Sequence, residues 1–309
     1  NVAVGAAALD ANTTASFNVG IGASALGSDT LGSRNVGIGH GALTTQNFTS
    51  STNSYNTAVG FQSGLALTDG QKNTFIGGLA GDAQTTADNN TAVGYIALSA
   101  NTTGGANTAV GQGALSANTT ASNNTAFGRS ALLSNTTGDT LTAVGVNALA
   151  TNTTAANNTA VGVNALYLTT TGASNTAMGK DALKTNTTGA ENTAIGALSL
   201  DACTTGNNNT AMGHNSLSTN ILSDHNVAIG NDALATHNTG SSIDAYNVAV
   251  GSGAGFAVTT GKQNTFIGGN AGDANTTADN NTAVGYNSLT ANTTGANNNA
   301  LGQSAMAAN

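Results

Sequence analysis

The sequence has no proline, no tryptophan and a single cysteine, and aromatic residues make up only 4% of its 309 positions. Charged residues are equally scarce, at 6% against roughly 25% in a typical soluble domain. So few large side chains cannot fill a wide globular core, although Ala, Val and Leu can fill a thin one in stacked layers. A lone cysteine excludes an internal disulfide, so hydrogen-bonded ladders and packing must hold the chain together.

Other absences narrow the function classes. The formal net charge is −8, and without a basic patch we expect no nucleic-acid partner. No apolar stretch approaches the roughly 20 residues that a membrane helix needs, so we expect no membrane insertion. The chain begins at Asn1 without a signal-like segment, which we interpret as a processed product or a piece of a longer chain.

What the sequence does contain is a repeat. The motif Asn-Val-Ala-Val-Gly at residues 1–5 recurs with small variations along the whole chain. It begins 18 times, at residues 1, 18, 35, 56, 73, 90, 107, 124, 141, 158, 175, 192, 209, 226, 247, 264, 281 and 298. The starts follow a 17-residue period, except that the coils 35–55 and 226–246 are 21-residue coils. We therefore interpret residues 1–309 as a single array of 18 coils.

A longer repeat lies over the short one. The two 21-residue coils begin at residues 35 and 226, and their flanking segments match at this same 191-residue spacing. Residues 72–78 read Lys-Asn-Thr-Phe-Ile-Gly-Gly, and residues 263–269 read Gln-Asn-Thr-Phe-Ile-Gly-Gly. This super-repeat suggests a parent chain that is periodic at the same scale.

Certain positions within the coil, counted from its first residue, are nearly invariant. Position 4 is always apolar, position 8 is Ala or Ser, and position 9 is Leu in 13 coils and Gly in four. Position 5 is a structural glycine in every coil: Gly5, Gly22, Gly39, Gly60, Gly77, Gly94, Gly111, Gly128, Gly145, Gly162, Gly179, Gly196, Gly213, Gly230, Gly251, Gly268, Gly285 and Gly302.

This pattern predicts an all-β solenoid. We expect a strand at positions 1–4, ended by a glycine with positive φ or a close backbone approach, and a second strand at positions 8–11. The Asn-Thr-Thr-Gly segments near positions 12–15 are typical of turns. A helix is the competing interpretation, but a glycine in every coil and runs of Asn and Thr suit it poorly.

Stacking such coils aligns equal residues in columns. The Asn at position 1 is expected to form an amide ladder from coil to coil, which only Leu141 interrupts. Successive strand residues point to opposite faces, and both faces of each strand are apolar or small. One face fills the interior, so the other should pack on a partner. Self-association into a cyclic homo-oligomer is the simplest solution, because it gives every copy the same contact.

Two segments carry a family resemblance. Residues 107–111 (Asn-Thr-Ala-Val-Gly) and 226–230 (Asn-Val-Ala-Ile-Gly) resemble the head repeats of YadA-like trimeric autotransporter adhesins, and similar repeats occur in phage tail fibres. The resemblance covers the whole chain. It implies a left-handed parallel β-roll, three chains side by side in a homotrimeric rod, and a role in attachment. Head repeats in that family are commonly shorter than the coils of this chain.

The reactive side chains do not form a recognisable site. His40 and His214 follow the position-5 glycine, and we place His225 and His237 in surface turns. No metal-ligand spacing and no Ser-His-Asp order is evident, so we expect no metal, no cofactor and no catalytic residue. Cys203 replaces a turn Asn and has no nameable base. The Asp82 and Asp273 segments lack the calcium-roll motif.

Glycosylation is a further hypothesis, since the Asn-x-Ser/Thr pattern occurs 14 times. The acceptors are Asn12, Asn47, Asn89, Asn101, Asn118, Asn123, Asn135, Asn152, Asn157, Asn186, Asn208, Asn275, Asn280 and Asn292. The alternative is that Asn and Thr are simply turn residues, which a repeat multiplies. Adjacent threonines such as Thr13 and Thr14 do not give the alternate-residue spacing of flat ice-binding solenoids.

These observations favour a structural fibre segment for attachment or adhesion, extracellular or on a virion, whose partners are its own copies and a cell-surface receptor or glycan. The alternative is a purely architectural filament, glycan-coated and polymerising end to end. An enzyme is not expected, because no acid, base or metal ligands cluster in the sequence.

Overall fold

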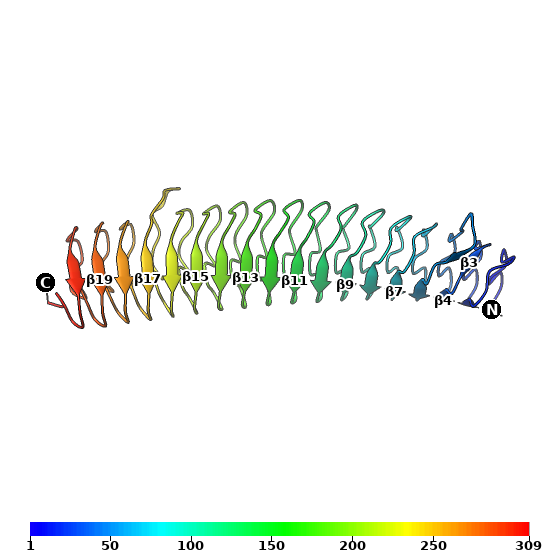
Figure 1. Cartoon of the computed structure of the whole chain (residues 1–309), viewed down its shortest axis with the longest axis horizontal. Coiled ribbons are helices and arrows are strands. Elements are labelled where there is room, and N and C mark those ends of the chain that lie inside the picture. The colour runs from blue at the N-terminus through cyan, green and yellow to red at the C-terminus, as the bar shows by residue number, and fades with distance from the viewer. Residues whose placement is uncertain (309) are drawn as a thin grey trace. The chain divides into compact units, whose positions relative to one another are not determined.

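Each coil contributes one short strand, and coils stack through these strands. The computed structural model describes residues 1–308, none of which lies in a helix. By its internal contacts the chain falls into two compact units, Asn1–Ala155 and Ala156–Asn309, which are described separately. The parallel β-solenoid with 17-residue coils that the repeat predicted is confirmed (Figure 1).

In the first unit, nine three-residue strands pair in parallel, and two two-residue strands form a separate ladder. Each strand residue pairs with the one 17 positions later, as Thr108 does with Thr125, and with the one 21 positions later across the long coil. The strands are β1 (Val2–Val4), β2 (Val19–Ile21), β3 (Gly32–Ser33), β4 (Val36–Ile38), β5 (Thr52–Asn53), β6 (Thr57–Val59), β7 (Thr74–Ile76), β8 (Thr91–Val93), β9 (Thr108–Val110), β10 (Thr125–Phe127) and β11 (Thr142–Val144).

The second unit repeats this arrangement with parallel strands in the same register. Its strands are β12 (Thr159–Val161), β13 (Thr176–Met178), β14 (Thr193–Ile195), β15 (Thr210–Met212), β16 (Val227–Ile229), β17 (Val248–Val250), β18 (Thr265–Ile267), β19 (Thr282–Val284) and β20 (Asn299–Leu301).

The interior of each coil is thin and built from small side chains. The strand residue at position 3, usually Ala, points inward and is buried, while positions 2 and 4 point outward. The Leu at position 9 fills the interior opposite the strand. Phe75 replaces the small residue of position 3, and the coils on either side of its ring carry Gly64 and Gly81 instead of Leu. A Cβ on Gly81 would lie 2.5 Å from the Phe75 ring, so the glycines make room for it. Phe266 is accommodated in the same way.

The prediction of a second strand at positions 8–11 is wrong. This segment is a run of turns in which positions 7 and 9 have positive φ, for example 52° at Leu115. Backbone hydrogen bonds close the turns locally, as Asn118 N–H donates to the Leu115 carbonyl at 3.1 Å. Other N–H groups still bond to the neighbouring coil, as Leu115 does to Ala131 at 3.0 Å. The inter-coil bonds therefore replace those of a strand and offset the left-handed conformation that Leu ordinarily avoids.

The glycine at position 5 behaves as predicted. Gly111 has φ of 134°, and a Cβ there would lie 2.5 Å from the carbonyl oxygen of Gly128 in the next coil. Both the conformation and the close backbone approach exclude a side chain. The same contact recurs along each unit, which explains why this position tolerates no other residue.

The Asn ladder at position 1 is also confirmed. Each buried side chain uses its Oδ1 to accept the backbone N–H of the Asn in the next coil, as between Asn107 and Asn124 at 3.0 Å. In most coils its Nδ2 donates to the carbonyl of position 15 in the same coil, as Asn107 does to Ala121 at 2.9 Å, whereas Asn35 and Asn226 use other acceptors. The amide thus joins strand to turn and coil to coil, which satisfies backbone groups that would otherwise be buried without partners.

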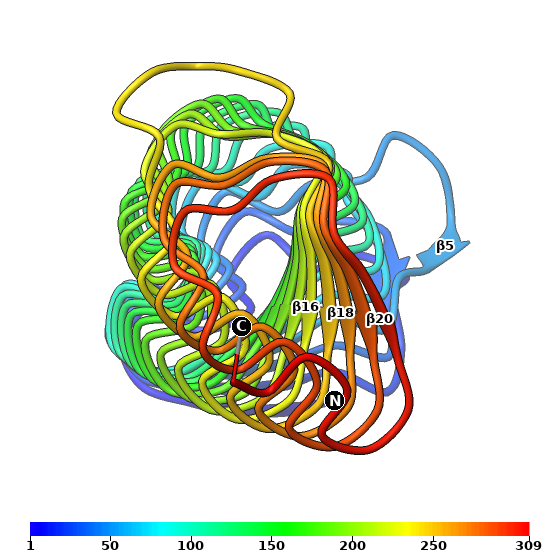
Figure 2. The ribbon, with the colours of Figure 1, turned by 90° about the vertical axis from the view of Figure 1, so that its left-hand side faces the viewer.

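Two loops project from the coils of their units (Figure 2). They belong to the first long coil, residues 35–55, and the second long coil, residues 226–246. In the first, β5 pairs with β3 of the preceding coil. In the second, Asp244 forms a single parallel bridge with Asp224. The four additional residues are therefore absorbed in one outer loop, and the strand register on either side is preserved.

Candidate attachment surface

A column of mainly polar side chains runs through the interior at position 12, where the composition predicted only a turn. The side chain at position 12 points into the coil, and its commonest occupant is a buried Asn. Asn118 donates from Nδ2 to the Oδ1 of Asn101 at 2.9 Å and to the Ala121 carbonyl at 3.0 Å. The signal was present in the sequence, because Asn recurs at position 12 as it does at position 1.

Cys203 occupies this interior column. It is buried, and its Sγ donates to the Gly206 carbonyl at 3.6 Å, where Asn would use its amide. Burial raises the pKa of its thiol to about 12. A thiol held protonated at neutral pH is a poor nucleophile. Its role in the fold is therefore that of a substitute for Asn.

His237 corrects another expectation. The sequence predicted a surface turn for it, but it lies at position 12 and its side chain is fully buried. Burial lowers the pKa of its imidazole to about 4. Neither ring nitrogen has a hydrogen-bond partner among residues 1–308. The physical reason is that position 12 faces inward whatever residue it carries.

The remaining histidines are at the surface. His40 stacks on Phe61 with 5.5 Å between ring centroids, and His214 is exposed. His225 stacks on Tyr246 at 5.0 Å and its Nδ1 lies 3.0 Å from Asp244. The structure does not bring these histidines together into one site.

The 14 glycosylation sequons separate into two classes by burial. Those at position 12 carry the interior Asn: seven are buried, Asn12 is half-buried, and their amides are committed to the fold. The acceptors exposed to solvent are Asn47, Asn89, Asn123, Asn157, Asn208 and Asn280. On the folded chain, a glycan would therefore be confined to these six positions.

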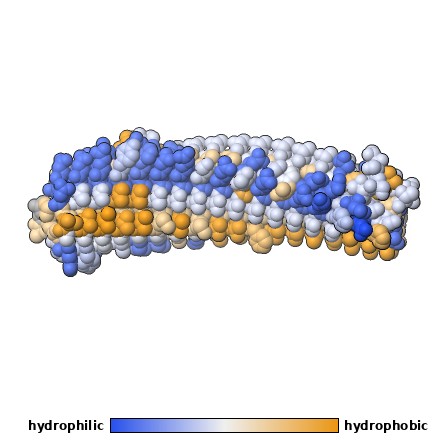
Figure 3. Space-filling model, viewed as in Figure 1, coloured by the Kyte–Doolittle hydropathy of each residue, from blue (hydrophilic) through white to orange (hydrophobic). Residues whose placement is uncertain are grey.

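The outward column at position 4 is an apolar feature that runs along each unit. Its residues are apolar in all coils and none of the outward strand positions 2 and 4 carries a charge. Phe127 is 55% exposed and Met178 43%. Apolar side chains lie in rows over the strands (Figure 3). Contiguous exposed apolar surface is typical of interaction sites.

No protein-family model matches this sequence, and no curated protein matches it either.

Acidic side chains supply no obvious cation site. Burial raises the pKa values of Asp82 and Asp273, and one carboxylate oxygen of each has no partner among the described residues. Across residues 1–308, no three His, Cys, Asp or Glu side chains gather as metal ligands do. The same residues include no helix that is long and apolar enough to span a membrane.

Proposed function

We propose that this chain is a structural segment of an attachment fibre, extracellular or on a virion, in which copies of the chain pack side by side. The observation that carries the proposal is the uncharged apolar column at position 4. It repeats in strict register, so an identical column on a second copy can meet it coil by coil. Burying exposed apolar surface at roughly 25 cal/mol per Å² supplies the driving force.

A threefold arrangement fits this column best. Three parallel copies around an axis would bring three position-4 columns together and leave the turns and the long-coil loops outside. The resemblance to trimeric adhesin head repeats points the same way and adds a left-handed β-roll. Such a fibre would display the same loops three times, which suits attachment through many weak contacts.

The test is the mass of the full chain in solution, measured by analytical ultracentrifugation. We expect three times the 29.9 kDa chain mass. Charging the column by the triple substitution Val93→Lys, Val110→Lys and Phe127→Lys should dissociate the trimer while circular dichroism stays β-like. The control, Thr103→Lys, Thr120→Lys and Thr137→Lys, adds the same charge on exposed turn residues and should remain trimeric. A wild-type monomer would refute the arrangement.

The exposed sequons favour a second candidate, the architectural filament coated with glycans. Asn89, Asn123 and Asn157 recur at position 17 and are exposed to solvent, so sugar attached there would line one side of the coils. Intact mass before and after enzymatic deglycosylation of the native material decides this point. A mass loss, together with end-to-end filaments that bind no surface, would favour the architectural role over attachment.

A further inference from the structure

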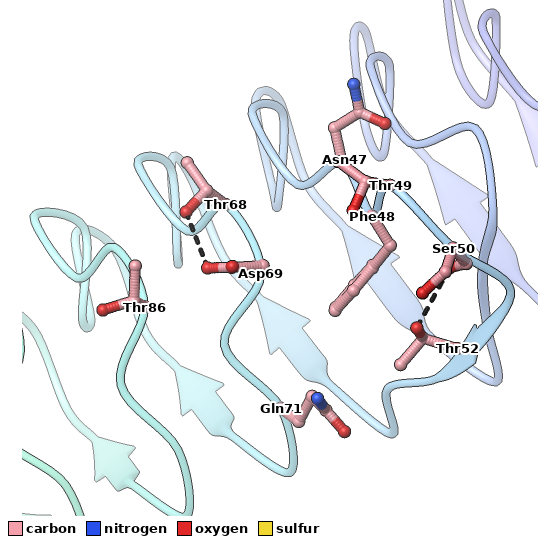
Figure 4. Close-up of a pocket in the computed structure, with 9 residues that line it drawn as sticks. All are labelled: Asn47, Phe48, Thr49, Ser50, Thr52, Thr68, Asp69, Gln71 and Thr86. Carbon is pink, nitrogen blue, oxygen red and sulfur yellow. Dashed lines mark hydrogen bonds between the residues drawn. The ribbon is translucent and has the colours of Figure 1, made fainter.

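The first long coil forms a cavity that the attachment surface described so far does not include. It has a volume of about 350 Å³ and opens on the outer side of the coils (Figure 4). Its walls come from three successive coils. The first long coil contributes Asn47–Ser50 and Thr52, the next coil contributes Thr68, Asp69 and Gln71, and the third contributes Thr86. The size lies at the lower end of the roughly 300–1,000 Å³ found for ligand sites, which suits one or two sugar rings.

Phe48 builds the wall of this cavity. Its ring is 5% exposed and lies against Gly32 of the preceding coil, where a Cβ would come within 2.7 Å of the ring. The residue 191 positions after Phe48 is Thr239, and the one after Gly32 is Ser223. The aromatic ring of the first long coil and the glycine of the preceding coil that admits it therefore occur together, and both are missing at the equivalent positions around the second long coil.

The cavity lining is rich in hydrogen-bonding groups that the fold leaves free. Apart from Phe48, every lining residue is polar. The Gln71 side-chain amide and the Ser50 and Thr86 hydroxyls make no hydrogen bond within residues 1–308. Asp69 accepts one bond, from the Thr68 hydroxyl at 3.1 Å, and its second oxygen remains available. The lining thus offers both donors and acceptors that bond to no other part of the described chain.

This chemistry selects a class of ligand. The lining contains no Lys, Arg or His, so it offers no counter-charge for phosphate, sulfate or a sialic acid. A single carboxylate is too little for a cation. The nearly complete polarity of the walls disfavours an apolar guest, which would leave their hydrogen bonds unmade. A neutral molecule with several hydroxyl groups can use the donors and acceptors together.

We propose that this cavity binds a neutral saccharide, such as the terminal sugar of a surface glycan. The proposal deepens the attachment function and rests on it for its biological purpose. An open, water-exposed site that exchanges hydrogen bonds with water binds one sugar weakly, on the order of millimolar. Repetition of the cavity on three chains would raise the strength of binding to a glycan-coated surface.

The test uses saturation-transfer NMR on the full chain with glucose, galactose, mannose, fucose and N-acetylglucosamine as probes. At least one of these sugars should bind, while sialic acid and inorganic phosphate should not. Asp69→Asn and Gln71→Met should each weaken binding about three- to tenfold. Matched controls are Thr260→Val and Lys262→Met, at the equivalent positions of the second super-repeat, and these should leave binding unchanged.

Several outcomes overturn the proposal: no neutral sugar binds, the anionic probes bind instead, or sugar binding is unaffected by both cavity variants. Ultracentrifugation of the same samples keeps the two proposals apart. A trimer that adheres to glycan-bearing cells equally well with Asp69→Asn would refute the sugar site and leave the attachment fibre standing. Loss of sugar binding in the variants, with the trimer intact, supports the sugar site.

Discussion

The two long coils are alike in the contacts that hold their outer loops and differ in the side chain buried at position 12. In the first, Arg34 donates to Asn53 at 3.1 Å and lies over the ring of Tyr55 at 5.7 Å. In the second, the residues at the same super-repeat positions are His225, Asp244 and Tyr246, and they make the same set of contacts. The outer loop is thus held twice by a basic side chain that bonds to the loop and stacks on a tyrosine.

Inside, the two coils diverge. Gln46 at position 12 of the first donates to Asp29 at 2.7 Å and accepts from Asn56 at 2.8 Å. His237 at position 12 of the second is buried, and its ring makes no such bonds within residues 1–308. The external clamp is therefore common to both long coils, whereas the side chain at position 12 is a hydrogen-bonded amide in the first and an imidazole without such bonds in the second.

The largest difference should appear on removing the aromatic wall. Phe48→Ala leaves a void where a nearly buried ring packed, and it should destabilise the first unit by about 3–5 kcal/mol. Thr239→Ala, its counterpart in the second long coil, should cost less than about 0.5 kcal/mol. Hydrogen exchange of the backbone around each loop measures both effects in the intact chain. Equal loss of protection at the two loops would contradict the difference in packing.

Acidification should weaken the second long coil. His237 has a pKa of about 4 in the folded chain and about 6.5 when unfolded, so its neutral form is favoured by folding. The stability that this group contributes is present above pH 6.5 and is lost as the pH falls toward 4, at most about 3 kcal/mol. Hydrogen exchange of residues 235–246 at pH 7 and pH 5 reports the loss. His237→Asn, which restores the usual residue of the column, should abolish the pH dependence.

The coil before the first long coil, which carries Asp29 at position 12, should respond in the opposite sense. Burial raises the pKa of Asp29, although hydrogen bonds from Gln46 and Gly32 oppose the shift. Folding therefore favours the protonated acid, whose contribution is present below its unfolded pKa and declines as the pH rises through its folded pKa. Asp29→Asn should stabilise the first unit at pH 7 by about 1 kcal/mol. A melting temperature that is unchanged at pH 7 would contradict this reasoning.

The external clamps should give the smallest effects. Arg34→Ala and His225→Ala each remove a stacked basic side chain at the surface, worth about 0.5–1 kcal/mol. Both side chains hold the loop through a polar contact, Arg34 with Asn53 and His225 with Asp244. Exchange rates of residues 50–55 and 241–246 measure the two variants, and unchanged exchange in either variant would exclude a role for that clamp.

Much of this fold could be predicted from the sequence, because stacked coils repeat their constraints. The 17-residue period, the strand before each position-5 glycine and the Asn ladder all follow from columns of equal residues. The segment around Leu115 could not be predicted in the same way. Leu favours other conformations, and its positive φ exists only because bonds to the adjacent coil stabilise it.

The candidate sites were less accessible to sequence reasoning. The inward direction of the His237 side chain depends on the backbone path of a turn, although the recurrence of Asn at position 12 indicated a shared environment for that position. The cavity beside Phe48 depends on the path of the outer loop that the four additional residues form. The sequence showed only the added length and the exchange of Phe48 for Thr239 between the super-repeats.

The glycine column also has a genetic consequence. Gly111 lies close to the backbone of Gly128, and each coil meets its neighbour through the same residues. Every coil therefore presents the same contact surface to the coil before it and to the coil after it. Recombination that adds or removes one whole 17-residue unit would create no unfamiliar junction, whereas losing a single residue would misalign every column beyond it. Such a gene can readily change the length of its product, whereas a substitution at any one position-5 glycine would disrupt the contact between two coils.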